Sequence, residues 1–135
     1  MSIEDLVDNF EALDDWEDRY KYLIGLGAGL PAMDDSLKTE HSKVRGCMSQ
    51  VWLVMGWDES GRLTIHADSD AQIVKGLIAV LVAIFEGRTK EEIEQLDIAG
   101  TFAQLGLDQH LSPNRRNGFF SMVEAVKAFT SGLRT

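Results

Sequence analysis

The order of the periodic segments predicts an α+β fold, in which helices flank a small antiparallel sheet of about three strands. Two segments in the middle of the chain alternate apolar and polar residues, as strands with one buried face do. The segments before and after them repeat their apolar residues every three or four positions, as amphipathic helices do. The length of 135 residues fits one domain, 1–135, which can bury a core without disulfides.

Two helices are expected before the sheet. Apolar residues at helical spacing give the segment 3–13 one buried face, and Ser2 can cap this helix. A second helix begins at the Asp14-Asp15 pair and ends at Leu30-Pro31. The connection that follows, 31–46, is long, and connections of this length without regular structure are often functional.

The sheet is expected to begin after this connection. Gln50 to Trp57 and Arg62 to Asp68 form an antiparallel hairpin around a turn at 58–61. A third strand is expected at Lys43 to Arg45 or nearby. Because the two strands alternate, one face of the sheet must be covered by helices.

Four helices are expected after the sheet. The first, from about 73 to 85, is apolar on most sides and therefore buried centrally, with Ser69 as its cap. Thr89 and Glu92 form a capping box that opens a second, short helix. A third short helix follows near 98–105, and Ser112-Pro113 begins the last one.

Composition and charge exclude several classes of function. The net charge of -9 and the pI near 4.7 argue against binding nucleic acid or an anionic membrane surface, both of which need a basic face. The apolar run 73–85 is too short to span a bilayer, and the acidic start of the chain lacks the features of a signal peptide. One cysteine cannot form an internal disulfide. The sequence therefore predicts a soluble, cytoplasmic protein.

Cys47 is the strongest candidate for a functional residue. A lone cysteine is usually a small, buried, inert hydrophobe. Cys47, however, stands before a strand rather than within an apolar run, and Gly46 leaves room beside its sulfur. The preceding segment, 38–46, carries more positive than negative charge, which favours the nucleophilic thiolate. Its charged and titratable residues are Lys38, Glu40, His41, Lys43 and Arg45.

The cysteine count narrows the chemistry. A cluster scaffold needs several cysteines and a zinc site about four ligands, so no metal site is expected among Cys47 and three scattered histidines. A single thiolate is sufficient for a sulfur relay, in which it takes the outer sulfur of a persulfide by a step that parallels thiol–disulfide exchange. Two alternatives stay open: a binding module in which Cys47 is dispensable, and a thiol-based redox enzyme.

A resemblance to a known family sharpens this interpretation. The segment Arg45-Gly46-Cys47-Met48-Ser49-Gln50-Val51-Trp52 resembles the G-C-x-S-Q-V-W signature of the SufE family. Three further blocks, at 16–31, 68–77 and 105–113, resemble other parts of that family's pattern in the same order, so the similarity covers roughly residues 10 to 130. One departure is the stretch from Pro113 to Gly118, where family members often have S-R-S-x-G; Arg115 remains a match.

The resemblance implies a fold like that of IscU-type scaffolds, with a small curved antiparallel sheet packed against helices. It implies that Cys47 accepts sulfur from a SufS-type (or CsdA-type) cysteine desulfurase, that the protein stimulates this enzyme, and that sulfur passes to a SufBCD-type scaffold for iron–sulfur cluster assembly. The pyridoxal phosphate belongs to the desulfurase, and no cofactor is expected in this chain. The expected class is a sulfurtransferase-type accessory protein with no turnover of its own. The sequence leaves a homodimer open.

Six further residues are candidates for supporting the cysteine. Ser49 and Gln50 can hydrogen-bond the sulfur or its loop, or simply begin the strand. Asp70 can bond back to the loop or act as a helix-start charge. An exposed thiolate oxidises readily, so we expect Cys47 to turn into a partly apolar pocket and to swing out when the desulfurase binds. The full set is Arg45, Gly46, Ser49, Gln50, Asp70 and Arg115.

Overall fold

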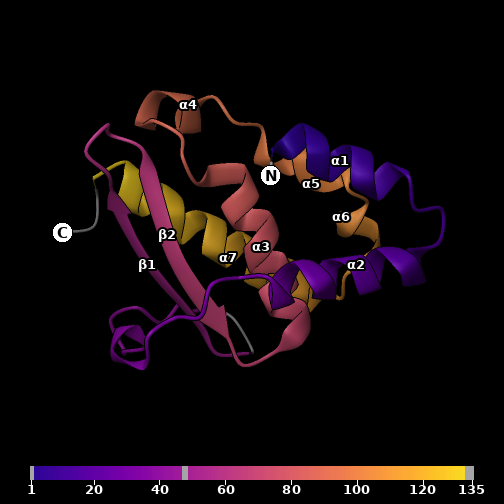
Figure 1. Cartoon of the computed structure of the whole chain (residues 1–135), viewed down its shortest axis with the longest axis horizontal. Coiled ribbons are helices and arrows are strands. Elements are labelled where there is room, and N and C mark those ends of the chain that lie inside the picture. Colours follow the sequence, from indigo (N-terminus) through magenta and orange to yellow (C-terminus); the bar gives the residue numbers. More distant parts are fainter. Residues whose placement is uncertain (1, 47–48, 133–135) are drawn as a thin grey trace.

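The computed structural model describes residues 2–46 and 49–132, so Cys47 and Met48 lie outside the described residues. Along the chain, helices come first, then a β-hairpin, then helices again, which confirms the α+β fold class (Figure 1). The helices before the hairpin are α1 (Ile3–Glu11), α2 (Trp16–Ala28) and a single 3₁₀ turn, η1 (Asp35–Leu37). Ser2 caps α1 as expected: its hydroxyl accepts the Asp5 N–H at 3.1 Å.

The hairpin consists of β1 (Val51–Trp57) and β2 (Leu63–Ser69), paired antiparallel from Val51↔Ser69 to Trp57↔Leu63. The expected third strand is reduced, among the described residues, to one antiparallel bridge between Lys43 and Trp52. Two backbone hydrogen bonds of 2.8 Å flank this bridge, from the Val44 N–H to the Val51 carbonyl and from the Leu53 N–H to the Ser42 carbonyl. The residues just before it form a turn, in which the Ser42 hydroxyl donates to the Leu37 carbonyl at 2.6 Å.

Helix α3 (Gln72–Phe85) is the centre of the fold. Nine of its residues are buried, as expected for a helix that is apolar on most sides. Helix α2 packs along it, β2 and α7 contact it from other directions, and α1 contacts it as well. Gly27 of α2 faces Gly76 of α3 at the crossing, where a Cβ on Gly27 would lie 2.5 Å from the Gly76 nitrogen. These glycines allow the two backbones to touch.

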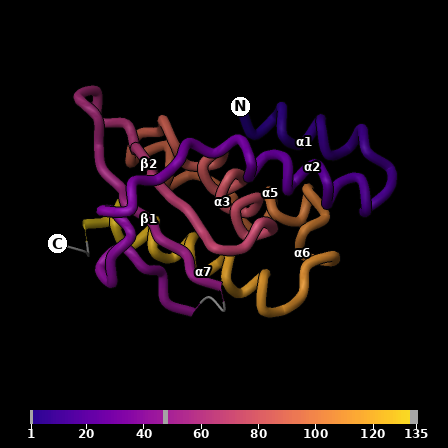
Figure 2. Tube along the Cα trace, turned by 60° about the horizontal axis from the view of Figure 1, so that its bottom comes forward, coloured from indigo at the N-terminus to yellow at the C-terminus, as the bar shows by residue number. Residues whose placement is uncertain are grey.

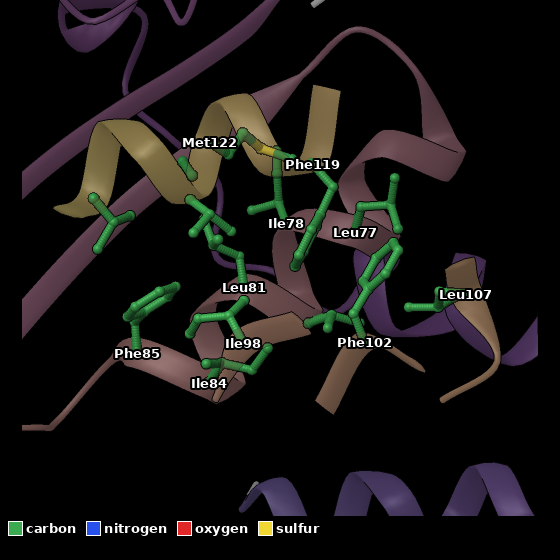
Figure 3. Close-up of a cluster of buried hydrophobic side chains, with 14 of the residues drawn as sticks. Leu77, Ile78, Leu81, Ile84, Phe85, Ile98, Phe102, Leu107, Phe119 and Met122 are labelled. Atoms are coloured by element: carbon green, nitrogen blue, oxygen red, sulfur yellow. The ribbon is translucent and has the colours of Figure 1, made fainter. Parts of the chain in front are cut away.

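Four helices complete the chain: α4 (Lys90–Glu94), α5 (Ile98–Gln104), α6 (Leu107–His110) and α7 (Pro113–Thr130). The capping box of Thr89 and Glu92 is present at α4, and Ser112 caps α7 with Pro113 in its first turn. Side chains of α3, α5, α6 and α7 meet in one buried cluster, which includes Leu81, Phe102 and Phe119 (Figure 3). The rings of Phe102 and Phe119 stack with their centroids 4.7 Å apart.

One expected cap is wrong. Ser69 is the last residue of β2 and is buried, and the residue at the N-cap of α3 is Ala71, which makes no side-chain cap hydrogen bond. The Ser69 hydroxyl instead accepts the Ala71 N–H at 3.2 Å within the turn. Pairing with Val51 keeps Ser69 in the strand, and this tertiary contact overrides its local preference for a cap.

The connection between α2 and β1 lies beside the strands (Figure 2). Lys38 places its ammonium group 5.4 Å from the ring centre of Trp52 on β1. The opposite face of the hairpin is buried against α3 and α7. The hairpin is thus held between the long connection and the two longest helices, and the residues on either side of 47–48 sit at one end of it.

Candidate functional site

Gly46, the last described residue before Cys47, lies against α7. Its φ of +87° is in the left-handed region, and a Cβ built on it would lie 2.6 Å from the Ser121 hydroxyl. Any larger residue at 46 would therefore be strained twice, once by the backbone and once by this contact. The structure gives Gly46 a close packing role against Ser121. The room that it was expected to leave beside the sulfur concerns Cys47, which lies outside the described residues.

Gln50, on the other side of the undescribed pair, is fastened to Asp70. The Gln50 N–H donates to Asp70 Oδ1 at 3.0 Å, and the Asp70 N–H donates to the Gln50 carbonyl at 3.3 Å. The two residues continue the β1–β2 register by one step beyond Val51↔Ser69. Asp70 therefore bonds to the segment around Cys47, which is the first of the two roles considered for it.

A pocket of about 440 Å³ opens between α3 and α7 beside this segment. Its base is apolar and buried, and its rim is polar, so it is partly apolar in the sense expected for a sulfur shelter. Ser49, two residues after Cys47, is part of the rim. The base consists of Val74, Leu77, Phe119 and Met122, with Gly118 beside them, and the rim of Ser49, Ser112, Asn114 and Arg115.

Arg115 stands at the rim on the first turn of α7. The Ser112 hydroxyl accepts the Arg115 backbone N–H at 3.3 Å and so fixes the start of the helix. The Arg115 guanidinium donates through Nη1 to the phenol oxygen of Tyr20 on α2. The arginine is exposed, and this contact ties its side chain to a helix 95 residues earlier in the sequence.

Two of the cations that precede Cys47 in the sequence, Lys38 and Arg45, lie beside carboxylates. Lys38 Nζ lies 3.0 Å from Asp68 Oδ2 and 3.4 Å from Asp35 Oδ1. Its hydrogen bond to Asp68 raises the pKa of Lys38 above the ordinary lysine value. Arg45 is mostly exposed and lies 3.8 Å from Glu40. Lys38 and Arg45 therefore each lie beside a carboxylate, and the exposed pair of Arg45 and Glu40 is expected to be weak.

Asp68 is held by two lysines. Burial raises the pKa of its carboxyl, but the hydrogen bonds from Lys38 and the Ser69 N–H, together with the charge of Lys75, outweigh burial and hold the pKa below its usual range. Lys75 Nζ is 3.5 Å from Asp68 Oδ1. The resulting cluster joins the long connection, β2 and α3 on the outer side of the hairpin.

Tyr20 and Ser121 were not among the residues predicted from the sequence. Tyr20 carried a signal, because it lies within the block at 16–31 that resembles the SufE family pattern. Ser121 carried none, since it is a half-buried serine on a helix and its importance depends on what packs against it. No group of three or more metal-binding side chains occurs within 2–46 and 49–132.

The sequence matches the SufE family, described as a Fe-S metabolism associated domain, over residues 4–130. The chain belongs to the SufE family. An uncharacterized SufE-like protein of Rhizobium meliloti (strain 1021) is 45% identical over 134 residues, which cover 97% of this chain and 96% of that protein. A second uncharacterized SufE-like protein, from Rhizobium etli (strain ATCC 51251), is 43% identical over 129 residues, or 93% of this chain and 87% of the relative.

A solved structure shares the fold of this SufE-family chain. The solution structure of a hypothetical protein from Thermus thermophilus superposes with a TM-score of 0.77 over 98% of this chain and 97% of that one, at 20% identity. At this identity the likeness concerns the fold alone. Within the part of the SufE-family chain that the structure describes, no helix has the length and apolarity needed to cross a bilayer. Family membership favours an accessory role in sulfur transfer.

Proposed function

We propose that this SufE-family protein, acting as one domain over 1–135, accepts sulfur as a persulfide on Cys47. The donor is a SufS-type or CsdA-type cysteine desulfurase in the cytoplasm, and the sulfur passes to iron–sulfur cluster assembly on a SufBCD-type scaffold. The observation that carries the proposal is the family match over 4–130, together with a single cysteine that lies two residues before Ser49 on the rim of the pocket. Pyridoxal phosphate acts in the desulfurase, and this chain contributes the accepting thiol.

The proposed step balances without an added oxidant or reductant. The Cys47 thiolate attacks the outer sulfur of the persulfide on the desulfurase cysteine. A new S–S bond forms on Cys47 as the original S–S bond breaks, and the desulfurase cysteine leaves as a thiolate. Sulfane sulfur keeps its oxidation state throughout, and the number of protons bound by the two partners together is unchanged. The protein stimulates the desulfurase because it removes the persulfide that would otherwise occupy the enzyme's cysteine.

The residues around 47–48 have distinct parts in this proposal. Gly46 and the Gln50–Asp70 pair hold the two ends of the loop. Arg115 supplies positive charge at the rim for the anionic persulfide, since charge-assisted hydrogen bonds are stronger than neutral ones. Ser49 offers a hydroxyl at the same rim. Arg45, which is exposed and 3.8 Å from Glu40, is available to a partner.

The pocket supports the expectation that the loaded sulfur is sheltered between transfers. Its buried, apolar base would exclude water and oxidants from a persulfide that entered it, and its polar rim would keep one side accessible. Release would then require the loop to leave the rim when a partner binds. A resting thiol that alkylates as fast as free cysteine would contradict this shelter.

Intact mass spectrometry tests the proposal. The protein is mixed with a cysteine desulfurase and free cysteine, and we expect the mass of one added sulfur, removed by a reductant and absent in Cys47→Ser. Desulfurase turnover is measured in parallel and should rise only with unaltered protein. Stimulation that survives Cys47→Ser would favour a binding module instead. Rapid peroxide consumption without sulfur uptake would point to a thiol-based redox enzyme.

A further inference from the structure

The contact between Tyr20 and Arg115 joins two distant parts of the chain at the edge of the pocket. Tyr20 belongs to α2, which packs on α3 and, among the described residues, contributes none to the pocket wall. Arg115 belongs to the first turn of α7 and does line the rim. The hydrogen bond from the guanidinium to the phenol oxygen therefore links the rim of the pocket to a helix that does not line it.

Tyr20 is itself held firmly. Its ring lies edge-on to Trp16, with centroids 6.5 Å apart and planes at 68°. Trp16 in turn stacks on His110, at the end of α6, with centroids 4.3 Å apart. His110 lies shortly before the start of α7, so these ring contacts link the helix that carries Tyr20 to the chain that leads into Arg115.

An exposed arginine needs such an anchor to act on a small anion. Its long side chain loses much of its rotamer freedom when it is fixed in one place. A phenol oxygen that accepts one N–H of the guanidinium fixes the planar group while the remaining donors stay free. Tyr20 therefore fixes the guanidinium of Arg115 before sulfur transfer begins. Less side-chain entropy is then lost when negative charge develops on the transferred sulfur.

We propose that Tyr20 is a positioning residue, which orients Arg115 over the pocket rim for persulfide transfer; this rests on the proposed sulfur relay. Tyr20 acts through the arginine and, within the described part of the chain, is not itself a residue of the pocket wall. If Tyr20 acted without Arg115, Tyr20→Phe would lower the rate of sulfur uptake equally in the presence and in the absence of the arginine.

The test is a double-mutant cycle on the full chain. Sulfur uptake by Cys47 is timed by quenched mass spectrometry at increasing desulfurase concentration, for Tyr20→Phe, Arg115→Gln and the pair. We expect Tyr20→Phe to lower the saturating rate roughly tenfold, with the half-saturating concentration unchanged. In the Arg115→Gln protein, Tyr20→Phe should cause no further loss. A matched control is Tyr22→Phe, which removes a phenol on the same helix whose oxygen accepts a hydrogen bond from Asn9 at 2.9 Å.

The possible results distinguish failure of the role proposed for Tyr20 from failure of the sulfur relay. Equal losses from Tyr20→Phe with and without Arg115 would overturn the positioning role, as would a loss equal to that of Tyr22→Phe. Thermal unfolding of each variant identifies a loss that comes from misfolding, and a Tyr20→Phe protein that melts like Tyr22→Phe removes that explanation. If unaltered protein takes up no sulfur, the sulfur relay itself fails. If it takes up sulfur and Tyr20→Phe does so at the same rate, only the role of Tyr20 fails.

Discussion

A Cβ added to Gly27 should separate the two helices at the centre of the fold. The added carbon would lie 2.5 Å from the Gly76 nitrogen and 2.6 Å from the Lys75 carbonyl carbon, both backbone atoms that cannot rotate away. Ordinary van der Waals contact begins at 3.4 Å, so α2 and α3 must part by roughly 0.9 Å. A gap of this size forfeits a quarter to a half of the dispersion energy between the facing side chains.

The expected change in the free energy of unfolding of Gly27→Ala is the sum of two opposing contributions. Replacing a helical glycine by alanine gains about 1 kcal/mol in helix propensity. Overpacking a close contact costs about 1–3 kcal/mol, and separating a buried helix pair adds to that cost. We expect Gly27→Ala to lower the free energy of unfolding by about 2 kcal/mol, out of a total of about 5–15 kcal/mol for a domain of this kind.

Gly25 provides the matched control on the same helix. A Cβ on Gly25 would meet nothing within 4 Å, so Gly25→Ala keeps the gain in propensity and avoids the clash. It should raise the free energy of unfolding by about 0.5–1 kcal/mol. Urea unfolding followed by far-ultraviolet circular dichroism measures both variants. If Gly27→Ala is as stable as Gly25→Ala, the close crossing of α2 and α3 does not exist in solution and the reasoning fails.

Three further predictions concern the loop, the outer ion cluster and α4. Gly46→Ala should slow sulfur uptake by Cys47 severalfold, with a small change in melting temperature. Adding Ser121→Ala should restore part of the rate, because the second substitution removes the clashing hydroxyl but leaves the backbone strain at residue 46. The lowered pKa of Asp68 stabilises the fold above about pH 4, and this contribution is lost as pH falls through the folded value; urea midpoints at pH 7 and pH 3 should therefore differ less for Asp68→Asn than for unaltered protein. Thr89→Ala should cost about 1 kcal/mol in urea unfolding through loss of the capping box. The control is Thr101→Ala inside α5, where the threonine is not a cap and its hydroxyl donates to the Asp97 carbonyl within the helix, so its cost should be smaller.

Features set by neighbouring residues were predictable from the sequence. The cap at Ser2, the capping box at Thr89 and the hairpin with its turn all depend on a few adjacent side chains, and all are present in the structure. The burial of α3 followed from its composition, because a helix that is apolar on most sides has no face to offer to water.

Features set by distant residues were not predictable. Ser69 has the local chemistry of a cap, but pairing with Val51 keeps it in β2. Lys38 counts as a free cation in the sequence, yet it is bound by Asp68, thirty positions away. The short helices η1 and α6 are too brief to show a period. The pocket joins residues from Ser49 to Met122, and only the packing of α3 on α7 brings them together.

The two fastened ends of the loop also set how far the thiol can reach. Gly46 and Gln50 are held by α7 and Asp70, and the four peptide bonds between them can span at most roughly 14 Å when fully extended. A tether of this length limits any movement of a group at position 47 to the neighbourhood of its two held ends. Under the proposed relay, the sulfur donor and the sulfur acceptor would each have to bind at this rim, and in turn, because one short loop would serve both exchanges.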